Sequence, residues 1–357
     1  MKKNRRPSFF STGLTLVEML VALLIGVILM LALVSLFNQS TRQTAQLEAR
    51  GYVAEAGRYA LDLLAQDVRQ AGSWGCLGTD FDMTDAALTF PERYWNHGVK
   101  VFHPSVAASW NHLPEIVRQV AVADQSLLFI SGARDTGVRL TGRNHGRLTG
   151  QAQVWKGFLT GLNPGNTLLL VNSQCEDGIV LHLDQFTSGD EDEEDSLQVD
   201  LPEDEWPEWL GQTIGQDQIN QDRGSQVYRI ESRLYFIGEH AGSRWLMRWQ
   251  AGAAQVEPLV EGIEQLFFLL GQKKSQRLAS YIYEQYTEDS PITSWTEADW
   301  QQVGALQVNL LVAAPQVIAG VNHSPIVFRP NSPAVSLPGR EASVYRMTTA
   351  LRGRLAR

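Results

Sequence analysis

The chain has 357 residues and a formal net charge of −9, with 39 Asp and Glu residues against 30 Lys and Arg. This acidic balance argues against non-specific binding to DNA or to anionic lipid. Hydrophobic residues make up 44% of the sequence, enough for a packed core, and the length predicts one large domain or two small ones.

The N-terminus combines a basic leader with a long apolar segment. Four basic side chains lie within the first six residues, and an apolar stretch of 24 residues runs from Leu14 to Phe37. At ~1.5 Å per residue this stretch is ~36 Å long, enough to cross a hydrocarbon core of ~30 Å. No basic residue follows until Arg42, so the positive-inside rule predicts a cytoplasmic N-terminus and an exported remainder.

One carboxylate, Glu18, interrupts the apolar stretch five residues after Gly13. A charge at the centre of a membrane helix costs roughly 2.5–3.5 kcal/mol on insertion scales, and less near an end. Two interpretations stay open. Glu18 either lies near the interface and snorkels, or it pairs with a positive group once the helix leaves the bilayer. The candidate partner is the free α-amine of a neighbouring subunit, because a charge tolerated only when paired sets the register between helices.

A resemblance to a known family begins at residues 13–18, which read GLTLVE. They resemble the class III signal of type IV prepilins and type II secretion pseudopilins. The resemblance implies that a prepilin peptidase cuts between Gly13 and Leu14, that Leu14 becomes N-methylated, and that Glu18 is the assembly glutamate. Leu14 departs from the family, which usually has Phe there. Removal of the leader, residues 1–13, leaves 26 Lys and Arg against 39 Asp and Glu, a charge of −13.

The helical pattern continues beyond the apolar stretch, because no proline occurs between Pro7 and Pro91. We predict one helix over residues 14–71, about 87 Å long, with a transmembrane and assembly part over 14–37 and an amphipathic continuation over 38–72. Its end is predicted at Gly72. The stripe of the second half is interpreted as packing on this protein's own domain, and the first half as packing with other subunits. The stripe comprises Leu47, Ala54, Leu61 and Val68, with Gly57, Leu64 and Ala71 at offset positions.

The chain has two cysteines, Cys76 and Cys175. An even, minimal count in an exported domain predicts one disulfide, which would close a loop of about 100 residues; two buried free thiols are the alternative. No Cys or His lies at ligand spacing from either cysteine, which argues against a metal site. Residues 67–76 read DVRQAGSWGC and resemble the D-x-R-x-A-G-x-x-G-C stretch of PilW-type minor pilins.

Residues 73–357 form the predicted exported, β-rich globular domain, in which short apolar runs alternate with turn signals. The fold class is α+β: a long pilin helix packed on a large antiparallel β-sheet domain. Residues 227–230 and 234–237 are interpreted as an antiparallel pair of strands, with 244–250 next in a meander. The predicted strands are Ser126–Ser131, Thr167–Val171, Gly178–Leu183, Gln226–Ile237, Arg244–Gln250, Gln265–Leu270 and Ala305–Ala313.

The C-terminal third carries further resemblance to the PilW and J-type pseudopilin families. Residues 260–266, VEGIEQL, precede a strand, and Trp300-x-x-Val303 leads into another. Residues 345–352, YRMTTALR, resemble the closing strand of the family.

Two charged clusters need interpretation. The acidic stretch 189–195, GDEDEED, offers Asp190, Asp192 and Glu194 as calcium ligands, but it lacks EF-hand spacing, so a solvated acidic loop is preferred. Arginines alternate with glycines over residues 134–150, and a mobile surface loop is preferred there over a DNA-binding one. These arginines are Arg134, Arg139, Arg143 and Arg147.

No metalloprotease H-E-x-x-H motif, G-x-S-x-G elbow, Walker A loop or dinucleotide fingerprint occurs, so no enzymatic activity and no cofactor are expected. The resemblance implies a minor pilin that primes type IV pilus assembly, with twitching motility, adhesion and DNA uptake as the processes it serves. Its implied partners are the prepilin peptidase, other minor pilins, the major pilin, the inner-membrane assembly platform and a tip adhesin. Its implied location is the inner membrane with a periplasmic domain, and then the fibre at the cell surface.

Three alternatives remain at this point. A J-type minor pseudopilin of type II secretion would use the same helix in a short periplasmic fibre. A membrane-anchored exported enzyme predicts that Glu18 is dispensable and that Gly13 is not cut. A DNA- or surface-binding tip protein predicts ligand binding that depends on Arg139, Arg143 and Arg147.

Overall fold

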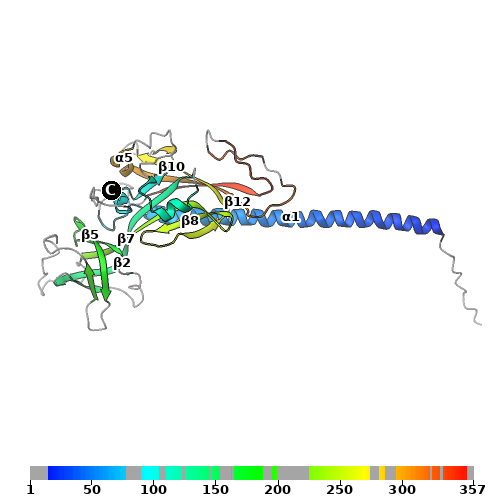
Figure 1. Ribbon diagram of the computed structural model, residues 1–357. Coiled ribbons are helices and arrows are strands. Elements are labelled where there is room, and N and C mark those ends of the chain that lie inside the picture. The colour runs from blue at the N-terminus through cyan, green and yellow to red at the C-terminus, as the bar shows by residue number, and fades with distance from the viewer. Residues whose placement is uncertain are drawn as a thin grey trace, which may run out of the picture.

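The computed structural model describes residues 15–77, 90–103, 110–122, 125–144, 147–152, 162, 165–187, 195–199, 225–273, 281–285, 295–321, 324–329 and 333–351. One helix, α1 (Leu16–Gln70), dominates this part of the chain and projects far beyond the rest of the molecule (Figure 1). Its 55 residues give a length of about 83 Å. The helix ends at Ala71, after which Gly72 adopts a positive φ of 67°. The prediction of one helix over 14–71 therefore holds within two residues at its start and one at its end.

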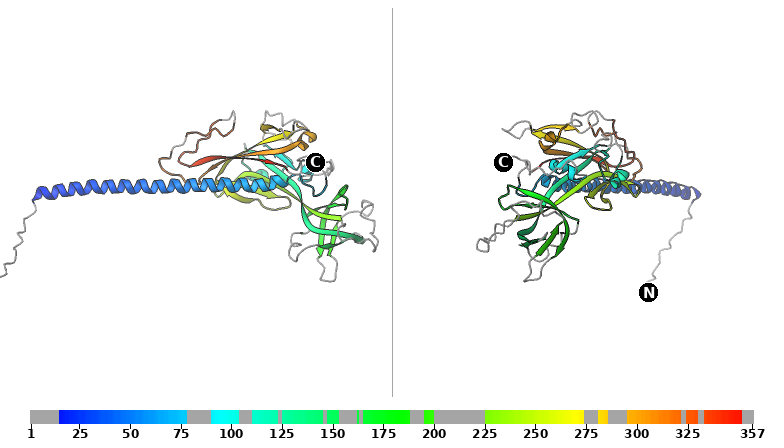
Figure 2. Two further views of the ribbon diagram at one scale, coloured as in Figure 1. Left: turned by 180° about the vertical axis from the view of Figure 1, so that it is seen from behind. Right: turned by 60° about the vertical axis from the view of Figure 1, so that its left-hand side comes forward.

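In the described part of the chain, nine strands form the larger sheet, in the order β1-β2-β3-β6-β5-β4-β7-β8-β9. Every neighbouring pair in this order is antiparallel. An additional antiparallel pairing of β2 with β7 closes six of the strands into a ring, which forms the green lobe set to one side of the α1 axis (Figures 1 and 2). The strands are β1 (Val99–Phe102), β2 (Leu127–Asn144), β3 (Arg147–Ala152), β4 (Thr167–Val171), β5 (Gly178–Thr187), β6 (Asp195–Val199), β7 (Ser225–His240), β8 (Ser243–Gln250) and β9 (Glu257–Glu261).

A second sheet has four described strands in the order β11-β10-β12-β13, all antiparallel. Its strands are β10 (Ile263–Lys273), β11 (Tyr281–Gln285), β12 (Val303–Ala313) and β13 (Ala342–Ala350). Among the described residues, three short helices lie in the connections: η1 (Glu92–His97), α3 (Glu115–Val120) and α5 (Glu297–Gln301). The second half of α1 packs chiefly on β13, with further contacts to β12 and β9 (Figure 2). The fold is thus α+β, with two antiparallel sheets rather than one.

Two hydrophobic clusters make up most of the described core. The first lies under α1 and joins its second half to β10, β12 and β13, with fully buried members such as Leu64, Phe268 and Leu310. The second is aromatic and includes Phe102, Phe129 and Phe236. Burying such apolar surface is the main driving force for folding, at roughly 25 cal/mol per Å².

The structure corrects two strand predictions. Residues 227–230 and 234–237 are not an antiparallel pair. They belong to one 16-residue strand, β7, because no Gly, Pro, Asn or Asp lies between them and the segment pairs with β2 and β8. The arginine–glycine segment is not a mobile loop. Residues 138–144 and 147–152 pair as the β2–β3 hairpin.

Candidate assembly helix and its attachment

Within the part of the chain that the structure describes, the first half of α1 is not buried by the domain. Every described residue from Thr15 to Thr44 is exposed, and the first buried position is Ala49. This helix is long and apolar enough to cross a membrane by length and composition. A stretch of Leu, Ile, Val and Met that lies outside the core must be covered by lipid or by other subunits.

Glu18 caps the N-terminus of α1. Thr15 is the N-cap residue, and its hydroxyl oxygen accepts a hydrogen bond from the backbone N–H of Glu18 at 3.3 Å. In return, the Glu18 carboxylate accepts bonds from the backbone N–H and the hydroxyl of Thr15, both at 3.1 Å. This reciprocal arrangement is a capping box, which satisfies N–H groups that have no partner within the helix.

Sequence reasoning missed the capping role, although its signal is present. The order T-x-x-E from Thr15 to Glu18 is the signature of a capping box. It provides Glu18 with local partners that neither the snorkelling nor the intersubunit interpretation includes. An ionised carboxylate offers about four acceptor sites, and Thr15 donates two hydrogen bonds to that of Glu18. The carboxylate can therefore accept from a further donor.

The second half of α1 attaches through a face of small residues. Five of its nine buried residues are Ala or Gly, which lets the helix backbone approach the sheets closely. Leu61, Leu64 and Val68 supply the bulk of the buried contact. The predicted stripe is therefore mostly buried on this protein's own domain, but Leu47 at its start is 67% exposed. The buried residues are Ala49, Val53, Ala56, Gly57, Ala60, Leu61, Leu64, Ala65 and Val68.

Gly57 marks the closest approach between α1 and β13. A Cβ atom at this position would lie 2.5 Å from Cδ2 of the Tyr345 ring, which is closer than real Cβ atoms approach a neighbour. The Tyr345 ring therefore occupies the space that a side chain at position 57 would need. By contrast, a Cβ atom added to Gly51 would have nothing within 4 Å, and this glycine is exposed.

A network of charges ties the end of α1 to β7. The Asp67 carboxylate accepts a bond from Arg233 at 2.6 Å and another from the Tyr235 hydroxyl. Arg233 also contacts Glu231, which in turn accepts from Arg229. The side chains of Asp67 and Arg233 are only 12% and 15% exposed, so either charge would be costly without the other.

The network sets the ionisation of its members. Burial disfavours the charge on Arg233, but the carboxylates of Asp67 and Glu231 outweigh that cost and raise its pKa above the ordinary value. Burial, together with the negative charge of Asp67, raises the pKa of Tyr235 well above its usual range. Tyr235 therefore stays a neutral hydrogen-bond donor throughout the physiological range.

One further ion pair holds the domain to α1 near the start of the buried half of the helix, and a second pair lies beside it within the domain. Arg50 of α1 pairs with Glu341 at 2.8 Å, just before β13 begins. The preceding residue, Arg340, pairs with Glu264 of β10 at 2.6 Å. The Tyr52 hydroxyl donates to the carbonyl of Glu261 at 3.3 Å, so β9 is attached to the same part of the helix.

The segment after α1 carries the motif that resembles PilW-type proteins, and the structure gives most of its residues a physical role. Gly72 donates its N–H to the Ser131 carbonyl at 2.8 Å, and its Cα lies 2.4 Å from where a Cβ on Gly98 would be. Gly75 has a positive φ of 67° and packs against the Tyr228 ring. A side chain at position 75 would push the segment off β7, and one at position 98 would meet the backbone of Gly72.

Cys76, at the end of this motif, forms a disulfide with Cys175, with 5.5 Å between the two Cα atoms. The structure thus contains the predicted bridge and no pair of free thiols. Cys175 lies in the turn between β4 and β5, so the bridge fastens the closed ring of strands to the end of α1. Linking positions 99 residues apart removes much of the freedom of the unfolded chain.

Several predicted site residues lie outside the described residues. These are Gly13 and Leu14, at the expected cleavage site, and the calcium candidates Asp190, Asp192 and Glu194. Among the residues that are described, no group of three or more His, Cys, Asp or Glu side chains is arranged to hold a metal ion. The structure does not bring Glu18 near either cysteine, because α1 separates them along its length (Figure 1).

Comparison with protein families finds one match. Residues 234–353 match the family described as Type IV pilus-assembly protein W. The PilW-type resemblance is thereby confirmed. The match covers about a third of the chain and contains β8 to β13, which include the three strands on which α1 chiefly packs, β9, β12 and β13. This match, together with the long apolar helix attached to antiparallel sheets, supports a pilin related to the type IV pilus.

A type IV-like pilin from Thermus thermophilus is similar at 14% identity with a TM-score of 0.20, over 54% of this chain and 87% of that one. No curated protein matches the chain.

Proposed function

We propose that this PilW-type protein is a minor pilin that primes assembly of a type IV pilus as part of a tip or initiation complex. The observation that carries the proposal is the unburied first half of α1, in which no described residue before Ala49 is buried. Such a surface is stable in a bilayer before assembly and in a bundle of like helices afterwards. The match of residues 234–353 to the pilus-assembly family supports the choice of a pilus machine.

The proposed pathway begins with insertion of the precursor, its N-terminus in the cytoplasm and its domain in the periplasm. Prepilin peptidase then cuts between Gly13 and Leu14, and Leu14 is N-methylated. The apolar helix leaves the bilayer at the inner-membrane assembly platform and joins those of other minor pilins and the major pilin. The domain remains outside the helix bundle, where it provides lateral contacts and a surface for a tip adhesin.

Glu18 has two successive roles in this proposal. In the free subunit it caps α1 through Thr15, which keeps the carboxylate hydrogen-bonded at the edge of the membrane. During docking its remaining acceptor sites receive the N-terminal amine of a neighbouring subunit. The capping box holds the carboxylate in place for this contact, so the charge is pre-organised rather than exposed on a freely rotating side chain.

The experiment that tests the proposal separates capping from charge. Glu18→Gln keeps a capping-box acceptor but removes the negative charge, because Gln serves at this position as well as Glu. Thr15→Ala removes the cap and keeps the charge. Each full-length variant is expressed in the native host, and processing, surface piliation and secretion are measured. We expect Glu18→Gln to be processed normally and to lose pili, and Thr15→Ala to retain most of them.

The controls give each rival its own outcome. Gly13→Ala is expected to block processing; normal processing would refute the prepilin signal. Normal pili with Glu18→Gln would refute the charge-pairing role while leaving the pilin assignment intact. Lost secretion with normal pili would move the protein to the J-type pseudopilins. Pili and secretion that are both independent of Glu18 and of cleavage would favour a membrane-anchored enzyme.

A further inference from the structure

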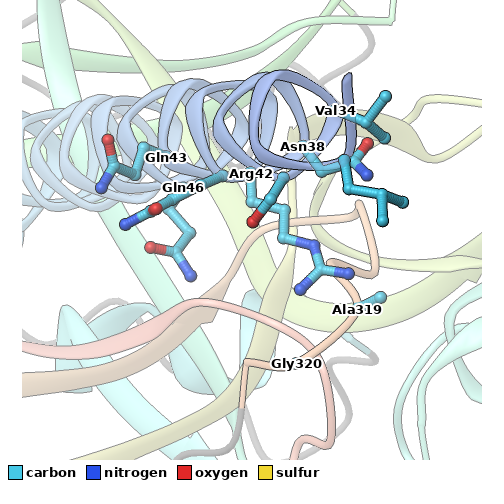
Figure 3. Close-up of a pocket in the computed structure, with 10 residues that line it drawn as sticks. Val34, Asn38, Arg42, Gln43, Gln46, Ala319 and Gly320 are labelled. Carbon is cyan, nitrogen blue, oxygen red and sulfur yellow. The ribbon is translucent and has the colours of Figure 1, made fainter. Parts of the chain in front are cut away.

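A groove lies beside α1 at the point where its apolar stretch ends (Figure 3). One wall is the helix from Leu31 to Gln46, and the other is formed by Ala319 and Gly320 in the connection between β12 and β13. The groove has a volume of about 660 Å³, within the range of small-molecule sites. We call it the α1–319 groove.

The lining of the α1–319 groove changes character along the helix. Leu31 and Val34 make its end nearest the N-terminus apolar, whereas Asn38, Arg42 and Gln46 make the other end polar. Among the described residues that line it, Arg42 is the one with a charge. The groove therefore pairs an apolar end with a single cation, separated by about two turns of helix.

This gradient coincides with the expected height of the membrane surface. The apolar stretch ends at Phe37, and Arg42 lies five residues further, about 7.5 Å along the axis. The headgroup layer of a bilayer extends about 5–8 Å beyond the hydrocarbon core on each side. Arg42 is thus at headgroup height when the apolar stretch spans the core, and its long side chain can reach back towards the core.

The second wall is fixed to the domain. Ile318 and Val321 flank Ala319 and Gly320 and are buried in the core under α1. The Ile318 N–H donates to the Gly339 carbonyl at 2.7 Å, and the Gly339 N–H donates to the Val321 carbonyl at 3.1 Å. These contacts hold the tip of the connection beside the helix and leave Ala319 and Gly320 exposed.

An exposed apolar side chain lies next to this tip. Val317 is 73% exposed, although most large apolar residues of the described domain are buried. An isolated apolar residue at headgroup height gains by entering the edge of the bilayer, at about 25 cal/mol per Å² of buried apolar surface.

We infer that the α1–319 groove binds one phospholipid of the leaflet that faces the domain. Its phosphodiester accepts from the Arg42 guanidinium, and an acyl chain lies along Leu31 and Val34. The inference rests on the membrane insertion of α1 that the proposed function includes. A bound headgroup between the helix and the connection fixes the height of the domain above the membrane before assembly.

A second copy of this chain fits the groove less well. If another α1 lay in it at the same height, its own Arg42 would face the first Arg42, because no other charged residue lies between Glu18 and Glu48. Like charges at close range are destabilising, whereas a phosphate compensates the charge through a hydrogen bond assisted by it.

The test uses the full-length chain in detergent micelles that contain a rising mole fraction of a phosphatidylethanolamine and phosphatidylglycerol mixture. The photoreactive residue p-benzoylphenylalanine is placed at position 319, and adducts are identified by intact mass. Position 24, in the exposed apolar part of α1, serves as the reference for annular lipid. Position 254, exposed in the turn after β8, serves as the reference for a surface outside the groove.

We expect the lipid adduct at position 319 to saturate at a low mole fraction, the adduct at 24 to rise without early saturation, and position 254 to give none. Arg42→Gln should move the midpoint at 319 by about tenfold, because one charge-assisted hydrogen bond is lost. Arg42→Lys should restore part of the affinity. Arg58→Gln, on an exposed residue of the same helix beyond the groove, should change nothing.

Two outcomes would overturn the inference: protein–protein adducts at 319 in place of lipid adducts, or a lipid adduct there that does not depend on Arg42. Neither would touch the proposed function. Failure of position 24 to give any lipid adduct would instead show that α1 is not inserted, which contradicts the anchor on which both rest.

Discussion

The two halves of α1 share one secondary structure but meet opposite surroundings. The first half presents large apolar side chains to the outside, whereas the second half turns mainly Ala and Gly towards the domain. Large side chains thus lie where lipid or other subunits must fill space, and small residues lie where the helix and the domain approach each other closely. The comparison teaches that the continuity of the helix does not depend on its own domain, and that the domain attaches only to its second half.

The largest effect is expected from breaking the charge network at the end of the second half. Asp67→Ala leaves the Arg233 guanidinium buried without its main partner and deprives the Tyr235 hydroxyl of its acceptor. We expect a loss of about 3–5 kcal/mol in the free energy of unfolding. Urea titration of the full chain in micelles, followed by tryptophan fluorescence, measures it. Asp62→Ala, at an exposed site on the same helix, is the control, and equal stability of the two variants would contradict the role of the network.

The same substitution made in each half tests the comparison directly. Leu64→Ala removes a fully buried side chain from the core and should cost about 2–5 kcal/mol. Leu24→Ala removes an exposed one and should change domain stability by less than about 0.5 kcal/mol. If Leu24→Ala destabilised the domain as much as Leu64→Ala in the same urea titration, the first half would not be independent of the domain.

Two glycines of α1 give a smaller contrast. Gly57→Ala should cost roughly 1–3 kcal/mol through the clash with Tyr345, offset by up to about 1 kcal/mol of helix propensity. Gly51→Ala meets open space and should stabilise the chain by up to about 1 kcal/mol. Thermal unfolding followed by circular dichroism should move the two midpoints in opposite directions. A stabilising Gly57→Ala would show that the Tyr345 ring moves aside at little cost.

The smallest expected effect is a decrease in the free energy of unfolding at alkaline pH. The folded state raises the pKa of Tyr235, so it keeps the phenol proton, while the unfolded chain loses it near pH 10. The stabilisation from this proton is therefore fully present below about pH 10 and is lost as the pH rises beyond it, by at most about 1.4 kcal/mol per pH unit. Urea titrations at pH 8 and pH 11 should show a smaller stability gap between the wild type and Tyr235→Phe at the higher pH. A constant gap would refute the coupling.

The sequence predicts the long helix and the central strands well because these have strong local signals. Apolar periodicity and the absence of proline define α1, and the predicted strand Thr167–Val171 has the bounds of β4 because a short apolar run lies between turn residues. Burial of Leu61, Leu64 and Val68 also follows from helical spacing alone. The family resemblance locates the last strand, predicted at 345–352 and observed as β13, Ala342–Ala350.

What the sequence does not predict depends on contacts distant along the chain. In the sequence, Asp67 is one of several acidic residues on a polar helix face. Its contact with Arg233, 166 residues away, is formed only in the folded chain. The β2–β7 pairing that closes the ring likewise has no local signature. Glu18 is the opposite case, since the T-x-x-E order of four adjacent residues is enough to predict its capping box.

Because α1 is continuous, its length determines the direction in which the domain projects from the helix. Ala49, the first buried residue, lies 31 residues beyond Glu18, about 47 Å along the axis. Each residue of a helix adds about 1.5 Å of height and about 100° of rotation. Deleting one residue between Asn38 and Leu47 would leave both ends chemically intact, yet it would rotate the domain by about 100° about the axis of the apolar half of α1. The direction in which this subunit displays its domain is therefore encoded in the number of residues that separate Glu18 from Ala49.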